Sequence, residues 1–411
     1  MPGLLFPAYQ KFYSALSNLD KFNKENNFFD NISCLDTFFS EFRNITFVMQ
    51  KSLAHTEYTS VYTRNRDKFL SDSIWFVRKR NETTKEQPFQ LIKQIEITLY
   101  YPDKGITFYS EKFSVDNDVE MSTLIEKFRR LFININPFEV FFSAEFTFYE
   151  KGSQEDLFNK LIHGIKSMKD FLKSMKEEIN EHCDLSGELI RKIDKLVFSQ
   201  LPRDMVLISD YVYYPEKEEF ERARRVSLIL MGQNKAINRT PLASFNKGFF
   251  GNLGGDYFQK FVVMHAMLQN VNLIPTMMVI FKDNTFELDA FNADIKTTIY
   301  RKINEVAKRI IEEGIKEFYY MQPYVACPYS LDNIKMKSQE RLSLSENEYL
   351  TFMKVDCLLN TEEYIFDGAN LCNVEYIAYQ IKKGRKNTLS LGKTNMFPIV
   401  EAFKKRRNLY N

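Results

Sequence analysis

A cation-rich stretch from Trp75 to Lys85 carries the side chains of this chain that are best suited to binding an anion. Within eleven residues it places four cations: Arg78, Lys79, Arg80 and Lys85. Arginine presents a planar fork of donors that matches phosphate oxygens, and lysine binds phosphate as a point charge. The stretch therefore predicts contacts with phosphate. The alternative that stays open is that these cations solvate the end of a helix, whose dipole favours positive charge there.

The elements that must position this stretch are helices. Apolar residues recur every three or four positions before residue 90: Leu35, Phe38, Phe42, Ile45, Val48 and Leu53. A second helix is predicted from about Asp67 through Asn81, and Pro88 stops whatever helix remains. Its predicted face consists of Phe69, Ser73, Phe76 and Arg80. The first 90 residues are thus predicted to form a compact all-helical unit.

Two stretches, Phe42–Lys51 and Trp75–Lys85, together resemble the HEPN superfamily of small helical domains, which occur in bacterial toxin–antitoxin and antiphage systems. In that family the last helix carries an arginine, often followed directly by asparagine, and a histidine four to six residues after the arginine. Arg80 and Asn81 match the first half of this motif. Lys85 stands where the motif histidine falls, five residues after the arginine.

The resemblance implies a site and a set of partners. HEPN domains dimerise so that both arginine/histidine pairs line one cleft, and many are metal-independent ribonucleases. Carried over to this chain, the catalytic candidates are Arg80, Asn81 and Lys85, with RNA as partner, a homodimer as assembly, and no metal or cofactor. A partner protein from the same operon is left open.

The substitution by lysine matters for the chemistry. Cleaving RNA without a metal requires a base for the 2′-hydroxyl proton and a fixed cation for the phosphoryl oxygens. Lysine has an unperturbed pKa of about 10.4, so it serves as a base only where burial or neighbouring cations lower that pKa by about three units. The sequence leaves open a metal-independent endoribonuclease and a degenerate version that binds RNA or only dimerises.

The hydrophobic period changes after residue 90. Ile95, Ile97 and Leu99 alternate with polar residues, and a turn at 101–105 predicts a hairpin that ITFYSEKF completes. A third strand is expected at 138–149. An apolar stripe from Leu157 to Ile179 then predicts a long helix, either as a dimer seam or, as the simpler alternative, in an antiparallel pair with 190–198.

The rest of the chain mixes helices and strands. Helices are predicted after Pro215, at 256–269 and at 296–313. A hairpin is predicted around Asp283-Asn284, followed by strands at 318–324, 349–358 and 363–366. The expected fold class is α+β with antiparallel hairpins and long helices. Its expected domains are a HEPN-like helical domain (1–90), a hairpin with a long helical hairpin (91–200), and an α+β domain with a basic tail (201–411).

The C-terminal tail is a second cationic region. From Ile377 onward the chain has nine cationic residues and the single acid Glu401, so the tail carries +8 while the whole chain carries +2. Such a cluster predicts phosphate contacts that weaken with salt, or equally a solvated tail. The predicted nucleic-acid-binding residues are Arg78, Lys79, Lys404, Lys405, Arg406 and Arg407.

Other motifs are weaker. Four glycines between Lys247 and Asp256 precede a helix but lack a phosphate-loop pattern, so a capped turn is expected. Glu287, Asp289 and Asp294 resemble part of a magnesium site, although solvent-facing residues of a hairpin explain them adequately. The five cysteines show no zinc spacing.

The amino-acid composition is that of a globular protein. Apolar residues make up 44% and charged residues 27%, which excludes a disordered or fibrous chain. Because no secretion signal and no apolar stretch of membrane length is visible, we expect a cytoplasmic protein without membrane partners.

The function expected from the sequence is an RNA-directed effector or sensor of a bacterial antiviral defence or toxin–antitoxin system. The alternative is a non-enzymatic dimerising interaction protein whose α+β body recognises a partner or small ligand.

Overall fold

The computed structural model describes residues 3–22, 27–115, 121–126, 138–196, 198, 207–224, 239–246, 255–267, 274–371, 373–383, 385–386 and 394–410. They form two compact units. Unit 1 comprises Met1–Glu96, Lys112–Thr123 and Glu145–Ile208, and unit 2 comprises Ile97–Glu111, Leu124–Ala144 and Ser209–Asn411. The combination of helices with two sheets confirms the α+β class. The segment boundaries at 90 and 200 stay a prediction, since the units follow packing and not chain order.

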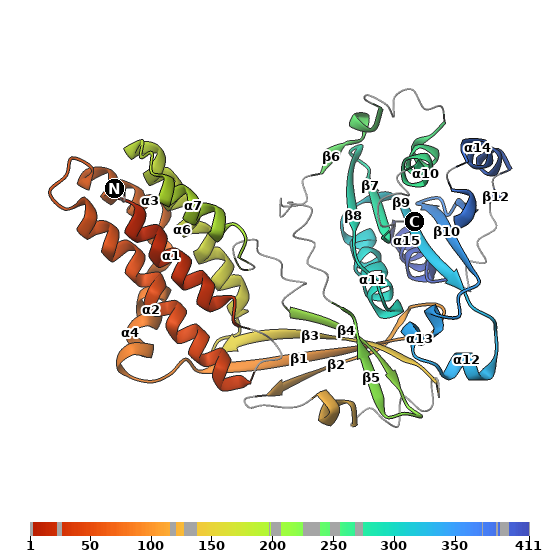
Figure 1. The fold of residues 1–411 in the computed structure, drawn as a ribbon, viewed down its shortest axis with the longest axis horizontal. Coiled ribbons are helices and arrows are strands. Elements are labelled where there is room, and N and C mark those ends of the chain that lie inside the picture. Colours follow the sequence, from red (N-terminus) through yellow and green to blue (C-terminus); the bar gives the residue numbers. More distant parts are fainter. Residues whose placement is uncertain are drawn as a thin grey trace. The chain divides into compact units, whose positions relative to one another are not determined.

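Unit 1 is built on helices. Their bounds are α1 (Phe6–Leu19), α2 (Phe28–Leu53), α3 (Thr59–Phe69), α4 (Ile74–Lys85), α6 (Leu157–Ile179) and α7 (Asp184–Ile193). Helix α2 begins where the Asn27 side chain accepts hydrogen bonds from two backbone amides, and α6 ends at Asn180, whose φ of 53° is left-handed. Helices α1 and α2 pack side by side (Figure 1).

Two expectations for these helices need correction. The single helix predicted from Asp67 through Asn81 is two helices, α3 and α4, separated by a 3₁₀ turn at Ser71–Ser73. Serine and aspartate favour such turns because their side chains bond to nearby backbone groups, and Ser73 Oγ donates to the Leu70 carbonyl. The dimer-seam reading of α6 is wrong because Leu161, Ile165, Met168 and Leu172 are fully buried inside unit 1.

Five strands form the first sheet, in the order β2-β1-β3-β4-β5. Their bounds are β1 (Leu91–Tyr100), β2 (Thr107–Val115), β3 (Val140–Glu150), β4 (Ile208–Tyr214) and β5 (Glu219–Arg222). The predicted turn at 101–105 joins neighbouring strands β1 and β2, and the expected third strand is β3. This part of the sequence prediction is confirmed.

The helix predicted after Pro215 is wrong for the residues up to 224, and the rest of it, which was expected to end at Gly232, lies outside the described residues. Residues Ile208–Tyr214 and Glu219–Arg222 instead pair as the antiparallel strands β4 and β5, with Glu218 in the left-handed region at φ 52°. The helical signal came from acid–base pairs four residues apart, each worth only about 0.2–0.5 kcal/mol. Aromatic residues that favour strands outweigh it, and the rings of Tyr211 and Phe220 pack at 5.8 Å.

Unit 2 contains a seven-stranded sheet of order β12-β11-β10-β9-β7-β8-β6, in which every neighbouring pair is antiparallel. The bounds are β6 (Thr240–Pro241), β7 (Thr276–Phe281), β8 (Thr285–Ala290), β9 (Ile315–Ala326), β10 (Asn347–Asp356), β11 (Thr361–Asp367) and β12 (Arg385–Lys386). The hairpin predicted around Asp283-Asn284 and the strands that become β9, β10 and β11 are confirmed.

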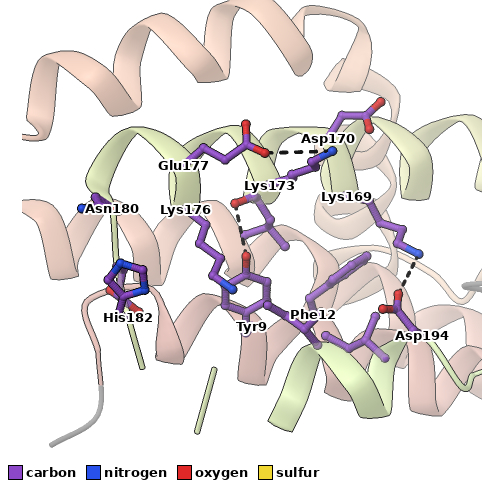
Figure 2. Close-up of a pocket in the computed structure, with 14 residues that line it drawn as sticks. Tyr9, Phe12, Lys169, Asp170, Lys173, Lys176, Glu177, Asn180, His182 and Asp194 are labelled. Atoms are coloured by element: carbon purple, nitrogen blue, oxygen red, sulfur yellow. Dashed lines mark hydrogen bonds and ion pairs between the residues drawn. The ribbon is translucent and has the colours of Figure 1, made fainter. Parts of the chain in front are cut away.

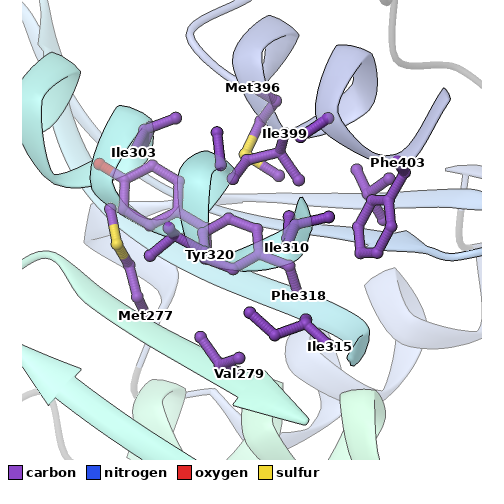
Figure 3. Packing of buried hydrophobic residues seen from close by; sticks show 14 of the residues in the cluster. Met277, Val279, Ile303, Ile310, Ile315, Phe318, Tyr320, Met396, Ile399 and Phe403 are labelled. Carbon is purple, nitrogen blue, oxygen red and sulfur yellow. The ribbon is translucent and has the colours of Figure 1, made fainter. Parts of the chain in front are cut away.

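Helices cover both faces of this sheet. Their bounds are α10 (Tyr257–Met267), α11 (Lys296–Glu312), α14 (Val374–Lys383) and α15 (Phe397–Tyr410), with the short helices α12 (Leu331–Lys335) and α13 (Ser338–Leu342). One core packs α11 and α15 against Phe318 and Tyr320 of β9 (Figure 3). The other packs α10 and α14 against Tyr319 and Met321, which point to the opposite face because strand side chains alternate.

The described residues of the predicted basic tail are largely helical. Helix α15 lies within the tail, as does α14 except for its first three residues, and Ile399, Val400 and Phe403 of α15 are buried in the core against α11. The sequence reading missed these helices because the cations masked an apolar face with helical spacing. Among the described residues, no helix combines the length and the apolar character needed to cross a membrane.

Candidate functional site

The last turns of α4 carry the residues that sequence analysis placed at the catalytic site. The helix is held by Phe76, whose ring packs against that of Phe42 at 4.9 Å between centroids. Arg80 follows Phe76 by four residues, so it projects from the same face one turn later. Its Nη1 donates to Asn81 Oδ1 at 3.1 Å, and its Nε is buried without a hydrogen-bond partner.

Arg80 and Lys85 share one electrostatic property. Within the part of the chain that the structure describes, neither has a carboxylate partner within ion-pair distance. Arg80 is partly buried, whereas Asn81 and Lys85 are exposed. Across the described ranges, the end of α4 therefore carries two cations that form no ion pair.

The two preceding cations differ. Arg78 Nε lies 3.6 Å from Glu82 Oε1 on the exposed side of the helix. Lys79 is buried, and its ammonium forms ion pairs with Glu82 and with Glu150 of β3. Because both carboxylates hold this charge inside unit 1, the phosphate-contacting role predicted for Lys79 is not supported. Lys79 is better explained as a residue that fixes α4 to β3.

A small cavity of about 270 Å³ opens beside the last turn of α4. It is lined by Lys79, Glu82, Thr83, Gln87, Pro88, Phe89, Gln90, Glu150 and Lys151. Arg80, Asn81 and Lys85 do not line it. The unpaired cations are therefore a surface feature and not the wall of this cavity.

The four C-terminal cations that were predicted to bind nucleic acid also differ in their burial and pairing. Arg406 is buried, and its Nη1 donates to the Ile310 carbonyl of α11 at 2.9 Å, so its predicted role in binding nucleic acid is not supported. Lys404 Nζ pairs with Glu401 at 2.8 Å. Lys405 and Arg407 are exposed. The strip predicted from the sequence is thus reduced to three surface cations, one of them paired.

A larger cavity, about 600 Å³, lies in unit 1 between α1, α6 and α7 (Figure 2). Its apolar lining includes Tyr9, Phe12, Leu172, Ile190 and Ile193. The charged lining includes Lys169, Asp170, Lys173, Lys176, Glu177, Glu181, His182 and Asp194. No serine or cysteine is among the described residues of this lining.

Polar contacts fix the walls of this cavity. The Tyr9 hydroxyl donates to the Leu172 carbonyl at 3.2 Å, and burial together with the Glu181 charge raises the pKa of Tyr9. Lys169 pairs with Asp194 at 3.2 Å. No sequence pattern indicates this cavity, because α1 is more than 150 residues away from the part of the lining that α6 and α7 contribute.

The acidic motif of unit 2 does not assemble as a metal site. Glu287 is bonded to Arg309 at 2.7 Å, Asp289 lies 3.4 Å from Lys302, and Asp294 accepts the Arg224 amide at 2.8 Å. Each carboxylate thus has its own donor. No cluster of histidine, cysteine and acidic side chains suited to a metal occurs among the described residues.

The glycine motif lies mostly outside the described residues, which begin again at Gly255. Asp256 Oδ1 accepts a hydrogen bond from the Gln259 amide at 2.8 Å, as a residue that caps the start of α10 would.

Neither a family, nor a curated protein, nor a solved structure matched this chain in our comparisons.

Proposed function

We propose that this protein is an RNA-directed effector or sensor, of the kind used in bacterial defence and toxin–antitoxin systems, and that the end of α4 contacts RNA phosphates. The observation that carries the proposal is the contrast within α4. Arg80 and Lys85 have no acidic partner among the described residues, whereas Arg78 and Lys79 are paired with acids. A guanidinium with free donors and a nearby ammonium are what phosphate binding requires.

Binding, and not cleavage, is the primary activity proposed. A lysine ammonium binds phosphate as a point charge. Lys85 is exposed, and its position is the one where the HEPN motif has its histidine. From the HEPN resemblance we further propose a homodimer in which two copies of Arg80 face one cleft that holds RNA. We also propose that the protein acts in the cytoplasm.

The test measures binding of a labelled single-stranded RNA of about 20 nucleotides to the full chain. Arg80→Gln is expected to weaken binding about tenfold. Arg78→Gln is the matched control, because it removes a cation from the same helix that is already paired with Glu82. Equal losses in both variants would contradict the proposal, and thermal unfolding would verify that both variants fold.

A second assay separates binding from cleavage. The full chain is incubated with total RNA in EDTA, which removes metal-dependent nucleases from consideration. Cleavage that Arg80→Ala abolishes would extend the proposal to a metal-independent endoribonuclease. If RNA neither binds nor is cleaved, the alternative function, a non-enzymatic interaction protein, replaces it.

A further inference from the structure

A third cavity, about 690 Å³, lies wholly within unit 2 and is independent of the α4 site. It opens on the sheet face that carries the α11 and α15 core, beyond the end of that core. The strands contribute Gln322, Tyr324, Thr351, Met353, Glu363 and Ile365. Lys296, Ile299 and Tyr300 of α11, the turn Pro102–Lys104, and Thr394 with Asn395 complete the lining. Its volume is that of a pocket for a small ligand.

The turn between β1 and β2 is fixed against α11. Asn304 Nδ2 donates to the Gly105 carbonyl at 2.6 Å and to the Tyr300 carbonyl at 2.7 Å. Gly105 has a φ of 63°, and a side chain there would overlap the ring of Tyr300. This wall is therefore held in place without a ligand.

The floor is aromatic and apolar. Met353 and Ile365 lie on the sheet, and Ile299 and Tyr300 cover them from α11. Tyr324 stacks on Tyr349 with 5.2 Å between ring centroids. Such a surface favours a flat ring over a flexible polar chain, because it offers faces for stacking and little compensation for buried polar atoms.

Two side-chain amides form an edge that can hydrogen-bond to a heterocycle. Asn395 Nδ2 donates to Gln322 Oε1 at 2.9 Å, and no other bond to these two side-chain amides is found within the described residues. This leaves the Gln322 amino group as a donor and Asn395 Oδ1 as an acceptor. A paired donor and acceptor is the pattern that the edge of a nucleobase complements.

Two cations stand at the rim. Lys104 Nζ lies 5.5 Å from the ring centroid of Phe397, at the first residue of α15, and Lys296 is the first residue of α11. Both are exposed, and neither has an acidic partner among the described residues. An anionic group at the rim would meet both charges, although Asp103 and Glu363 also line the cavity and oppose it.

We propose that this cavity binds a mononucleotide, with the base over the sheet and against the amide edge, and the phosphate at the lysine rim. Neither lysines alone nor rings alone require this class of ligand. The combination of a flat apolar floor, a donor–acceptor edge and unpaired cations matches its three chemical parts.

The experiment titrates the full chain calorimetrically with AMP, GMP, CMP and UMP. At least one should bind with a Kd below about 1 mM, and its nucleoside should bind about tenfold more weakly because it lacks the phosphate. The variant Lys104→Glu/Lys296→Glu should weaken the mononucleotide about tenfold and leave the nucleoside unchanged. Gln322→Leu should weaken both, because it removes the base edge.

The matched control is Lys382→Glu/Lys383→Glu, which reverses two exposed lysines of α14 outside the cavity. It should leave the Kd within about twofold of the wild type. The proposal is overturned if no mononucleotide binds below about 1 mM, or if the α14 variant loses as much affinity as the cavity variant. Because the RNA assay uses α4 variants, its failure would leave this result unaffected.

Discussion

Arg301 and Asp210 form a two-pronged ion pair inside unit 2. Arg301 Nε lies 2.9 Å from Asp210 Oδ1, and Nη2 lies 3.0 Å from Oδ2, so that α11 is joined to β4. Asp210 is 5% exposed, which removes water as a substitute partner. Arg301 Nη1 also pairs with Glu305 at 2.7 Å, so the loss of Asp210 would leave the guanidinium with one of its two carboxylates.

Asp210→Ala is therefore expected to lower the free energy of unfolding by about 3 kcal/mol, the lower end of the range for a broken buried pair, because Glu305 still compensates part of the charge. Chemical denaturation of the full chain gives the measurement. Glu188→Ala is the control, because its pair with Lys192 is exposed on α7 and screened by water, so its loss should change stability little. Similar losses in the two variants would mean that the Arg301 pair is no stronger than a surface pair.

Lys79 is predicted to stabilise unit 1 and not to bind RNA. Lys79→Met leaves the Glu82 and Glu150 carboxylates without their shared cation, and should cost about 3 kcal/mol of unfolding free energy. RNA affinity should stay within about twofold once the variant is folded. A large loss of RNA affinity without a loss of stability would contradict this prediction and indicate that Lys79 contacts RNA.

Gly164 of α6 lies against the ring of Phe76 of α4. A side chain at this position would overlap the ring of Phe76, so Gly164→Ala should destabilise the protein by about 1–3 kcal/mol. Gly187→Ala in α7 is the opposite case, because nothing lies within 4 Å of the added carbon. It should stabilise by about 0.5 kcal/mol, through the better helix propensity of alanine. Thermal midpoints that fall equally in both variants would refute this packing.

His265 gives unit 2 a pH dependence. Burial lowers the pKa of His265 below its ordinary 6.5, although the bond to the Phe261 carbonyl opposes this shift. The rings of Phe261 and Phe352 face the imidazole, with centroids at 4.3 and 6.3 Å. The unfolded chain therefore binds the proton more readily, and this contribution to stability is present above pH 6.5 and is lost as the pH falls through the lower folded-state pKa.

The matched variant is His265→Asn, which keeps a donor for the Phe261 carbonyl and does not titrate. The wild type should lose more unfolding free energy between pH 7 and 5 than this variant does. Parallel pH profiles for the two proteins would contradict the lowered pKa.

Hydrophobic periodicity predicted the elements whose buried residues keep a regular spacing. Strands β7 to β11 and helices α6 and α11 follow from alternation or helical spacing, because each buries one regular face. The β4–β5 hairpin was not predicted because acid–base pairs at helical spacing concealed its strand-favouring aromatic residues. Helices α14 and α15 were not predicted because their cations concealed an apolar face with helical spacing. The same holds for the site. Sequence marked Arg80 and Lys85, but no local pattern indicates that Glu150, on β3, neutralises Lys79.

The cavities could not be predicted from the sequence, because residues far apart in the chain line them. Gln322 and Asn395 meet only because α15 begins against β9. Neither residue belongs to a recognisable motif, and a lone amide in a strand is ordinarily a surface residue.

The salt dependence of RNA binding tests the central claim most directly. Each phosphate contact on a single strand contributes about −0.7 to the slope of log affinity against log salt. Arg80→Gln/Lys85→Gln should flatten that slope by about 1.4, whereas Lys404→Gln/Lys405→Gln should leave it unchanged. If the α4 variant keeps the wild-type slope and the α15 variant flattens it, the end of α4 is not where RNA binds.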